Sequence, residues 1–288
     1  MRDDADPTAA IGSAVRSFYD DLPFNHWGSV RAAADAIRTN VIRDTYPDLH
    51  ALLGSGEVRS VAEFGCGAGW LACSLARHYG LAVTALDFSA KALQRAQALA
   101  VEVRVADRVT FVCRNLFDEL PVSDVDLVIS LGVLHHTGDA RRAFGHVQRA
   151  ACAGGHVHVG LYHRHGRQVF LEMFRELVAS RGEAAAFERF RALTAGRGSD
   201  EEHLQSWFRD QVLHPHETQH TLREVVGWLD EDGLELRSTS INRFERIDGR
   251  DALFEMEVGY AERSRQANVV EGRFFPGFFT FLAQRAKR

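Results

Sequence analysis

The chain has 288 residues, of which 45% are hydrophobic, with 34 Lys and Arg against 39 Asp and Glu. Its net charge of -5 excludes a general positive field that would hold a polyanion, so we expect no nucleic-acid partner. The first residues lack an apolar segment, and no run approaches the roughly 18 apolar residues of a membrane helix. We therefore expect a cytoplasmic protein without a signal peptide or a membrane partner.

Residues 1–57 combine helical patterning with mixed polarity and predict an N-terminal helical cover. From Val58 onward, short apolar runs alternate with amphipathic stretches. This alternation predicts an α/β fold, a doubly wound parallel sheet with helices on both faces. The predicted elements are strands at 58–64, 81–86, 109–113, 125–130 and 156–161, and helices at 68–79, 89–101 and 139–151.

The alternation stops after the fifth predicted strand. Residues 167–212 have helical periodicity, and Thr221 with Glu224 forms a capping-box signature for a helix that Gly233 ends. Strands are predicted at 234–241 and 274–282, with a charged helical segment between them. We divide the chain into a helical cover at 1–57, an α/β core at 58–165, a helical insertion that caps the acceptor at 166–232, and completion of the sheet with a small insertion at 233–288.

Three glycines, Gly65, Gly67 and Gly69, connect the first predicted strand to the next helix. Glycines there allow a sharp turn and a close approach to a ligand, and the helix N–H groups point toward it. A dinucleotide-binding fingerprint requires glycine at position 70, where this chain has Trp70. The spacing therefore disfavours an NAD-dependent enzyme.

Asp87 ends the second predicted strand and precedes Ser89. A carboxylate at this tip can accept hydrogen bonds from two ribose hydroxyls, and such charge-assisted bonds are strong. The alternative is an acidic residue at a helix N-terminus, with Ser89 as the N-cap. The glycine loop favours the ribose interpretation.

Four segments, at 63–69, 87–89, 131–137 and 153–157, resemble the successive motifs of class I S-adenosylmethionine (SAM)-dependent methyltransferases. The resemblance covers residues 58–163 and 233–283 and implies a Rossmann-like seven-stranded sheet with a reversed, antiparallel last strand. It also implies SAM as the cofactor, with its methionine part against Gly65 and Gly67 and its ribose on Asp87. The residues expected to bind SAM are Tyr19, Glu63, Gly65, Gly67, Gly69, Asp87, Phe88, Asn115, Leu116 and Leu131.

The tip of the third predicted strand departs from the family pattern. Many members place an Asp there for the adenine amino group, whereas this chain has Asn115 followed by Leu116. The Asn115 amide oxygen can still accept a hydrogen bond. The alternative is a loop asparagine that favours a turn.

Methyl transfer needs an aligned acceptor and exclusion of water, and it needs a base only if the acceptor loses a proton. Candidate bases follow the fourth and fifth predicted strands: His135, Tyr162 and His163. For His135 and its neighbour His136, the alternative is that one ring packs on the sheet and the other caps a helix. Arg164 or Arg167 could clamp a carboxylate or phosphate, although a surface helix is the favoured interpretation for Arg167. The residues expected on the acceptor side are His26, His136, Arg164 and His216.

Three histidines and two carboxylates fall between residues 210 and 221. His214 and His216 flank a proline, so their side chains should point apart, which is poor geometry for joint ligation. We therefore predict no metal site, with a His216 and His220 pair as the alternative. The segment should instead order a loop and contribute polar groups to the acceptor pocket.

The aromatic segment 18–27 is the candidate lid. Resemblance places Tyr19 near the cofactor, where an aromatic ring would attract a sulfonium. The alternative is an aromatic helix end packed on the core. The Phe-rich segment 274–281 is expected to be strand core.

These features predict a SAM-dependent methyltransferase that methylates an O or N of a small molecule, in specialised metabolite biosynthesis. The expected partner is the small-molecule acceptor, and a homodimer is compatible with the sequence. The alternatives are a peptide or protein methyltransferase and a SAM-binding protein that transfers no methyl group.

Overall fold

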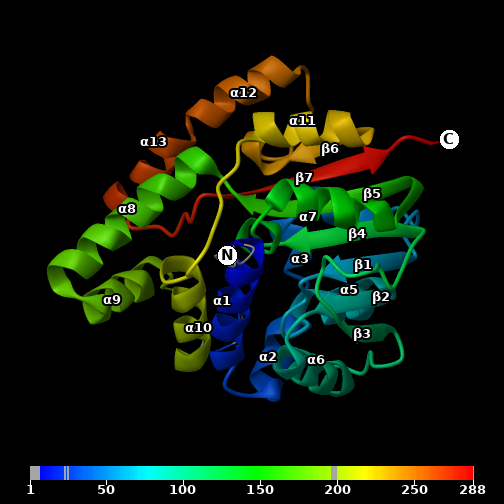
Figure 1. Ribbon diagram of the computed structural model, residues 1–288, viewed down its shortest axis with the longest axis horizontal. Helices are drawn as coiled ribbons and strands as arrows, with labels where there is room; N and C mark the ends of the chain where they lie inside the picture. The colour runs from blue at the N-terminus through cyan, green and yellow to red at the C-terminus, as the bar shows by residue number, and fades with distance from the viewer. Residues whose placement is uncertain (1–6, 23, 25, 196–199, 288) are drawn as a thin grey trace, which may run out of the picture.

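The computed structural model describes residues 7–22, 24, 26–195 and 200–287, which form an α/β fold (Figure 1). Within them, seven strands form one sheet in the order β3-β2-β1-β4-β5-β7-β6. The first five strands are parallel, whereas β7 runs antiparallel between β5 and β6. The strands are β1 (Ser60–Phe64), β2 (Ala82–Asp87), β3 (Val109–Cys113), β4 (Val125–Leu131), β5 (Ala151–Tyr162), β6 (Leu234–Thr239) and β7 (Phe278–Arg285).

Helices lie on both faces of the sheet and beyond the carboxyl ends of its parallel strands (Figure 1). They are α1 (Pro7–Asp21), α2 (Val30–Arg38), α3 (Ile42–Thr45), α4 (Pro47–Gly54), α5 (Trp70–Tyr79), α6 (Ala90–Glu102), α7 (Ala140–Val147), α8 (Arg164–Arg181), α9 (Glu183–Leu193), α10 (Glu201–Val212), α11 (Leu222–Asp232), α12 (Arg250–Val258) and α13 (Tyr260–Arg265). The predicted doubly wound class and the antiparallel last strand are confirmed.

Two hydrophobic cores flank the sheet because the strands are apolar on both faces. Phe64 and Phe144 belong to the core that β1 shares with α7 and α11. Leu127 and Ile129 belong to the opposite core, shared with α2, α4, α5 and α6. The capping box that begins α11 is present, with Thr221 and Glu224 each accepting a hydrogen bond from the other's backbone N–H.

The last strand begins later than predicted, at Phe278 rather than at residue 274. Before it, the chain passes so close to the start of α8 that a Cβ on Gly277 would lie 2.2 Å from the Arg167 nitrogen. Gly277 has a φ of +70°, and its carbonyl accepts a hydrogen bond from the His163 N–H. This crossing over α8, which periodicity does not reveal, prevents pairing with β5. Phe274 instead joins the core of the insertion.

The insertion α8–α10 has a small aromatic core of its own. Phe174, Phe190 and Phe208 pack there, with the rings of Phe190 and Phe208 5.6 Å apart and those of Phe190 and Phe274 5.5 Å apart. Helix α8 begins at Arg164, three residues before the predicted start. Because the insertion is packed internally, it stands as a fixed wall beyond the strand tips.

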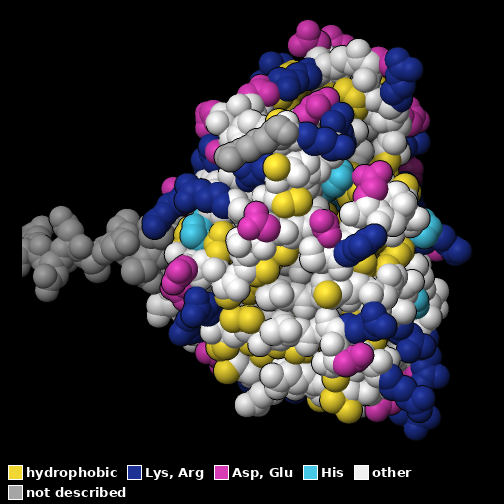
Figure 2. All heavy atoms as spheres, turned by 90° about the vertical axis from the view of Figure 1, so that its right-hand side faces the viewer, with side chains coloured by type: hydrophobic (Ala, Val, Ile, Leu, Met, Phe, Trp, Pro, Cys, Tyr) yellow, Lys and Arg dark blue, Asp and Glu magenta, His cyan; other side chains and the backbone are white. Residues whose placement is uncertain are grey.

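The face opposite the insertion carries interspersed basic and acidic side chains (Figure 2). This mixture agrees with the small net charge of -5. Among the residues that the structure describes, no helix combines the length and the hydropathy needed to cross a membrane.

His158 is a buried histidine in β5, beneath α3 and α4. Its ring packs edge-on against Tyr46 at 5.6 Å, and its Nε2 lies 3.9 Å from the Asp48 carboxylate. Burial lowers the pKa of His158 to about 4, and the Asp48 charge only partly offsets this effect. His158 is therefore neutral at pH 7.

We predict that His158 makes the fold acid-sensitive. Between pH 6.5 and 4, His158 binds a proton in the unfolded chain but stays neutral in the folded protein. The free energy of unfolding therefore decreases as the pH falls through this range. The loss is on the order of 3 kcal/mol for a shift of this size. Urea unfolding at pH 7 and pH 4.5 should show a smaller loss for His158→Phe than for the wild type. Equal losses in the two proteins would contradict the assignment.

Candidate functional site

The glycine loop after β1 is attached to the end of β2. The N–H groups of Gly65 and Cys66 both donate to the Leu86 carbonyl, at 2.8 and 2.9 Å, and the Gly67 N–H donates to Asp87 Oδ2 at 2.8 Å. A Cβ on Gly65 would lie 2.3 Å from Cγ2 of Val133, and its φ of +80° also favours glycine. The loop therefore passes directly over the residues that follow β4.

Gly69 has a different function from the other two glycines. It is the N-cap of α5 with a φ of +79°, and a Cβ there would lie 2.7 Å from the Ala96 Cβ. Gly69 thus allows α5 to pack closely on α6 and does not line the cavity described below. This position does not fit the expected contact of Gly69 with the cofactor.

Asp87 presents a buried carboxylate at the carboxyl end of β2. Its Oδ1 accepts from the Ser89 N–H at 2.9 Å, while Oδ2 holds the glycine loop. Burial raises the pKa of Asp87, and the bonds from Ser89 and Gly67 partly offset that rise. Ser89 is also the N-cap of α6, as predicted. Asp87 therefore orders the loop and faces the cavity at the same time.

A cavity enclosing about 800 Å³ of empty space, its mouth included, lies at the carboxyl ends of β1, β2 and β4. The strand order reverses between β1 and β4, and ligands of open α/β sheets bind at such a switch point. The cavity is lined by Val15, Tyr19, Phe24, Gly65, Gly67, Leu86, Asp87, Phe88, Ser89, Ala92, Arg114, Leu116, Leu131, Gly132, Val133, His136 and Thr137.

Glu63 lies beneath the glycine loop and does not line the cavity. Its burial, together with the nearby charge of Asp87, raises its pKa to about 8. Its Oε2 is buried and has no hydrogen-bond partner among the described residues. Glu63 is therefore a mostly neutral acid at pH 7, placed behind the loop rather than against a ligand.

The tip of β3 contributes different residues from those expected. The Asn115 side chain accepts from the Phe117 N–H at 3.0 Å, and the Asn115 N–H donates to Asp118 at 3.1 Å. Asn115 thus stabilises a turn, the alternative that its sequence context left open, and does not line the cavity. Its neighbours Arg114 and Leu116 line it instead. Sequence reasoning missed Arg114 because the family pattern directs attention to the next position.

Helix α1 covers the cavity, and hydrogen bonds to two other helices fix its C-terminal end. The Tyr19 hydroxyl donates to Asp210 of α10 at 2.7 Å. The Lys91 ammonium donates to the Asp20 and Asp21 carbonyls at 2.7 and 3.3 Å. The negative end of the helix dipole also attracts this cation. The C-terminal end of α1 is therefore held over the site, whereas residues 23 and 25 of the candidate lid lie outside the described residues.

His26 binds neighbouring elements together and does not line the cavity. Its backbone N–H donates to the Ser206 hydroxyl at 3.1 Å, and its Nε2 lies 3.1 Å from Arg95 and 3.3 Å from Glu202. The ring therefore lies between α6 and α10. This placement does not fit the expected contact with an acceptor.

His136 is the histidine of the predicted set that lines the cavity. Its Nδ1 lies 2.9 Å from the His216 carbonyl oxygen and must donate to it. Its buried Nε2 has no partner among the described residues. Burial, the largest effect, lowers the pKa of His136 to about 4. Neutral His136 therefore presents an unpaired Nε2 lone pair.

His216 belongs to a segment that is fastened to the residues after β4. Its Nε2 contacts the Thr137 carbonyl at 3.1 Å, and the Thr218 N–H donates to the His135 carbonyl at 2.7 Å. The segment 214–218 thus fixes the position of His136. His216 itself does not line the cavity.

His135 and Tyr162 lie behind His136, outside the cavity lining. The His135 Nδ1 accepts from the Tyr162 N–H at 3.3 Å, and the two rings are 4.0 Å apart. The Tyr162 hydroxyl accepts from Gln211 at 2.7 Å, and burial raises its pKa well above the usual value. Both side chains are therefore placed to support the wall of the cavity.

Arg167 is fully buried, which contradicts the interpretation that it begins a surface helix. Its guanidinium lies 3.7 Å from the Tyr162 ring, donates to Glu217 at 2.6 Å and donates to the Gln211 carbonyl at 2.7 Å. A buried charge requires such partners. Because they are already supplied by the protein, Arg167 is not free to clamp a carboxylate of the acceptor.

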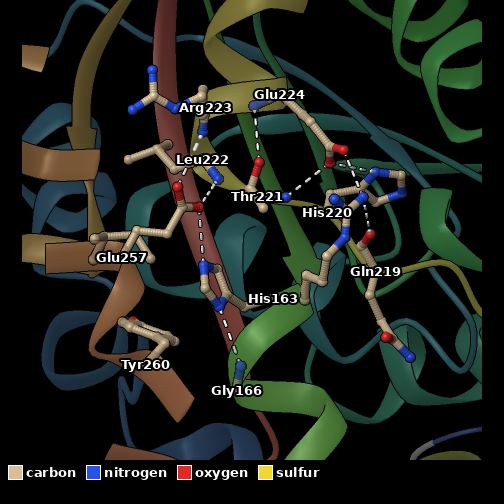
Figure 3. A network of polar contacts seen from close by, with 12 residues as sticks. His163, Gly166, Gln219, His220, Thr221, Leu222, Arg223, Glu224, Glu257 and Tyr260 are labelled. Carbon is tan, nitrogen blue, oxygen red and sulfur yellow. Dashed lines mark hydrogen bonds and ion pairs between the residues drawn. The ribbon is translucent and has the colours of Figure 1, made fainter. Parts of the chain in front are cut away.

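His163 joins three elements and does not line the cavity, and Figure 3 shows its ring pointing at Glu257. Its Nε2 donates to Glu257 at 3.0 Å, and its Nδ1 accepts from the Gly166 N–H at 3.3 Å. Glu257 also accepts from the Leu222 N–H at the start of α11. Because both ring nitrogens are occupied, this placement contradicts the expectation that His163 faces the acceptor as a base.

Arg164 lies at the edge of the same region. Its Nη2 donates to Glu224 at 2.5 Å and to the Gln219 carbonyl at 3.3 Å. It does not line the cavity. The expected contact between Arg164 and the acceptor therefore has no geometric support.

Residues 62–157 match the family model of the methyltransferase domain. A ubiquinone biosynthesis O-methyltransferase of Alkalilimnicola ehrlichii is 41% identical over 110 residues, which are 36% of this chain and 42% of that protein. An uncharacterised protein of Synechococcus sp. is 28% identical over 195 residues, which are 60% of this chain and 46% of that protein. The chain thus spans less than half the length of these two relatives.

The fold is similar to that of magnesium protoporphyrin IX methyltransferase from Synechocystis PCC 6803, solved with bound SAM. The TM-score is 0.53 at 16% identity, with 99% of this chain and 100% of the other covered. At this identity the likeness concerns the fold. Taken with the matched family model, the strand order and the glycine loop, it shows that the chain carries a class I SAM-dependent methyltransferase domain.

Proposed function

We propose that this protein transfers a methyl group from SAM to an oxygen or nitrogen of a small molecule. The observation that carries the proposal is the cavity at the switch point, with the glycine loop and Asp87 at one side and His136 at the other. The first side suits a nucleoside that carries an amino acid, and the second suits a polar acceptor atom.

The residues of the cavity fit SAM. Gly65 and Gly67 leave backbone surface free for the methionine part, and Asp87 can accept hydrogen bonds from ribose hydroxyls. Phe88, Leu116 and Leu131 offer apolar contact to the adenine and its surroundings. Bound there, SAM supplies an activated methyl group on a sulfonium.

The rest of the cavity would orient the acceptor and exclude water. His136 lines that wall and its buried Nε2 has no partner among the described residues, so it is the group that we expect to meet the acceptor. Val15 and Tyr19 of α1 close the cavity from above. Expulsion of water strengthens each polar contact inside such a site.

A small acceptor is favoured because α1 and α10 are bonded to each other over the site through Tyr19 and Asp210. The proposed role in specialised metabolism rests on the same two observations as the small acceptor. The chain has a negative net charge, and its helical insertion is large enough to close a pocket. A peptide or protein acceptor would require this cover to open. Methylation of a peptide mixture in preference to small molecules would reject our proposal.

We predict that SAM binds this chain with micromolar affinity or better and that NAD does not bind. Asp87→Ala should weaken SAM binding by about 1–3 kcal/mol, because it removes an acceptor for the ribose and frees the glycine loop. Titration calorimetry measures the affinity for SAM and for NAD. Asp107→Ala, an exposed position outside the cavity, is the matched control and should bind SAM like the wild type. Equal affinity of the Asp87 and Asp107 variants would refute the ribose assignment.

We also predict that Gly65→Ala strongly weakens SAM binding, because the new methyl group would overlap Val133. The double variant Gly65→Ala/Val133→Ala should regain part of the affinity. The positive φ at position 65 still costs about 1–2 kcal/mol, so recovery should be incomplete. Calorimetry on the two single variants and the double variant measures the coupling. Strictly additive effects would show that the Val133 contact does not matter.

A further inference from the structure

Asp210 of α10 is a buried carboxylate that lies one hydrogen bond away from the cavity. Helices α1 and α10 lie side by side (Figure 1), and Tyr19 of α1 lines the cavity while its hydroxyl donates to Asp210 Oδ1 at 2.7 Å. The second carboxylate oxygen, Oδ2, accepts from Gln211 Nε2 at 2.9 Å. Asp210 itself is 5% exposed and does not line the cavity. It therefore acts on a ligand only through Tyr19 and through its charge.

The partners of Asp210 hold it in its ionised form. Gln211 Oε1 accepts from Arg167 at 3.3 Å, so the amide nitrogen of Gln211 faces Asp210 as a donor. Burial raises the pKa of Tyr19 well above its usual value, and the Asp210 charge raises it further, so the phenol keeps its proton. Burial also raises the pKa of Asp210, but the two donors and the charge of Arg167 oppose that rise. Each oxygen of Asp210 thus receives a donated proton and needs none of its own.

The charged groups packed behind Tyr19 carry one negative charge in excess. Arg167 is the buried cation there, and it already donates to Glu217 at 2.6 Å. One guanidinium thus stands against two carboxylates, those of Asp210 and Glu217. Buried charges require neutralising partners, and the direct partners of Asp210 are a phenol and an amide. A cation in the cavity would therefore be attracted to this wall.

The other titratable groups near this wall do not cancel the excess charge. Burial lowers the pKa of His136 to about 4 and that of His214 to about 3, so both rings are neutral at pH 7. Arg114 lines the cavity at the tip of β3, the edge strand, which is separated from β4 by two strands. Arg16 of α1 lies 5.5 Å from the Phe88 ring but is exposed, where solvent screens its charge.

Tyr19 lies between the two ends of the cavity. Its ring centre is 6.4 Å from that of Phe88, the neighbour of Asp87, and 6.5 Å from that of His136. In the function proposed above, Asp87 holds the ribose and His136 meets the acceptor. The sulfur of SAM joins the ribose to the methyl group that the acceptor receives. The sulfonium therefore belongs between these two ends, on the side that Tyr19 covers.

We propose that Asp210 is a positioning residue that acts through Tyr19 and makes the cavity select cationic SAM over its neutral product, S-adenosylhomocysteine. The inference rests on the function proposed above and goes beyond it, because it gives the helical insertion a role in cofactor discrimination. When the methyl group is transferred, its carbon–sulfur bond breaks and the electron pair stays on sulfur. The product has then lost the charge that attracts it to Asp210, so it is held less tightly than SAM.

The test compares three ligands of different charge on the full chain. Asp210→Asn removes the charge but keeps the shape and an oxygen that can accept from Tyr19. Titration calorimetry is done with SAM, with S-adenosylhomocysteine, and with sinefungin, in which an ammonium group replaces the sulfonium. We expect the dissociation constants of the two cations to rise about tenfold, and that of S-adenosylhomocysteine to change by about twofold or less. Damage to packing would weaken all three ligands alike, so the ratio isolates the charge.

Asp126→Asn is the matched control. Asp126 accepts from the Arg59 and Ser60 N–H groups at 2.9 and 3.0 Å, at the start of β1 and outside the cavity lining. Its substitution removes a hydrogen-bonded carboxylate at the opposite end of the sheet and should leave the ratio of dissociation constants unchanged. The same change of ratio in the Asp126 and Asp210 variants would overturn the inference.

Tyr19→Phe is the second variant, which keeps the inference testable if Asp210→Asn does not fold. It removes the hydroxyl through which Asp210 reaches the cavity, so the preference for SAM over S-adenosylhomocysteine should fall in the same direction. An unchanged ratio in Asp210→Asn, or in Tyr19→Phe where the first variant is not folded, would overturn the inference and leave methyl transfer intact. A wild-type chain that binds none of the three ligands would refute the proposed function together with the inference.

Discussion

The end of β2 holds the glycine loop that follows β1, and the cavity is built around that attachment. One carbonyl, that of Leu86, accepts two N–H groups of the loop, and the Asp87 carboxylate accepts a third. These bonds place Gly65 directly on Val133, so the loop also determines how closely β1 approaches the residues after β4. The backbone of the glycine loop therefore forms one surface of the cavity. The Asp87 carboxylate, which orders the loop, also lines the cavity.

Buried charges play a second, structural part at the tip of β5. Arg167 is neutralised by Glu217, and His163 is held by Glu257 of α12, which also accepts a hydrogen bond from Leu222 at the start of α11. Each pair connects the strand tip to a different later segment of the chain. These groups look catalytic in a sequence because they are polar and follow a strand, yet their partners leave them no free atom for a substrate. Among the described residues near the cavity, the buried atoms without a partner include His136 Nε2 and Glu63 Oε2.

Local patterns predicted the parts of the molecule that depend on local interactions. The glycine spacing, the Asp87 position and the Thr221 capping box all involve residues close in sequence, and the structure contains each of these elements. The last strand was placed too early because the crossing of Gly277 over α8 joins residues more than 100 positions apart. The structural roles of His163 and Arg167 could not be predicted for the same reason, because their partners Glu257 and Glu217 are distant in sequence. The tautomer of His136 depends on one carbonyl of residue 216, which no residue pattern reveals.

The separate aromatic core of α8–α10 has a consequence for the evolution of this protein. Phe174, Phe190 and Phe208 pack with one another and not within the two cores that flank the sheet. Substitutions in the insertion are therefore absorbed within it, while the strands that carry the glycine loop keep their own packing. The insertion bears on the site through α1, which Asp210 holds at Tyr19, so its sequence can diverge while the strands that carry the glycine loop and Asp87 are inherited unchanged.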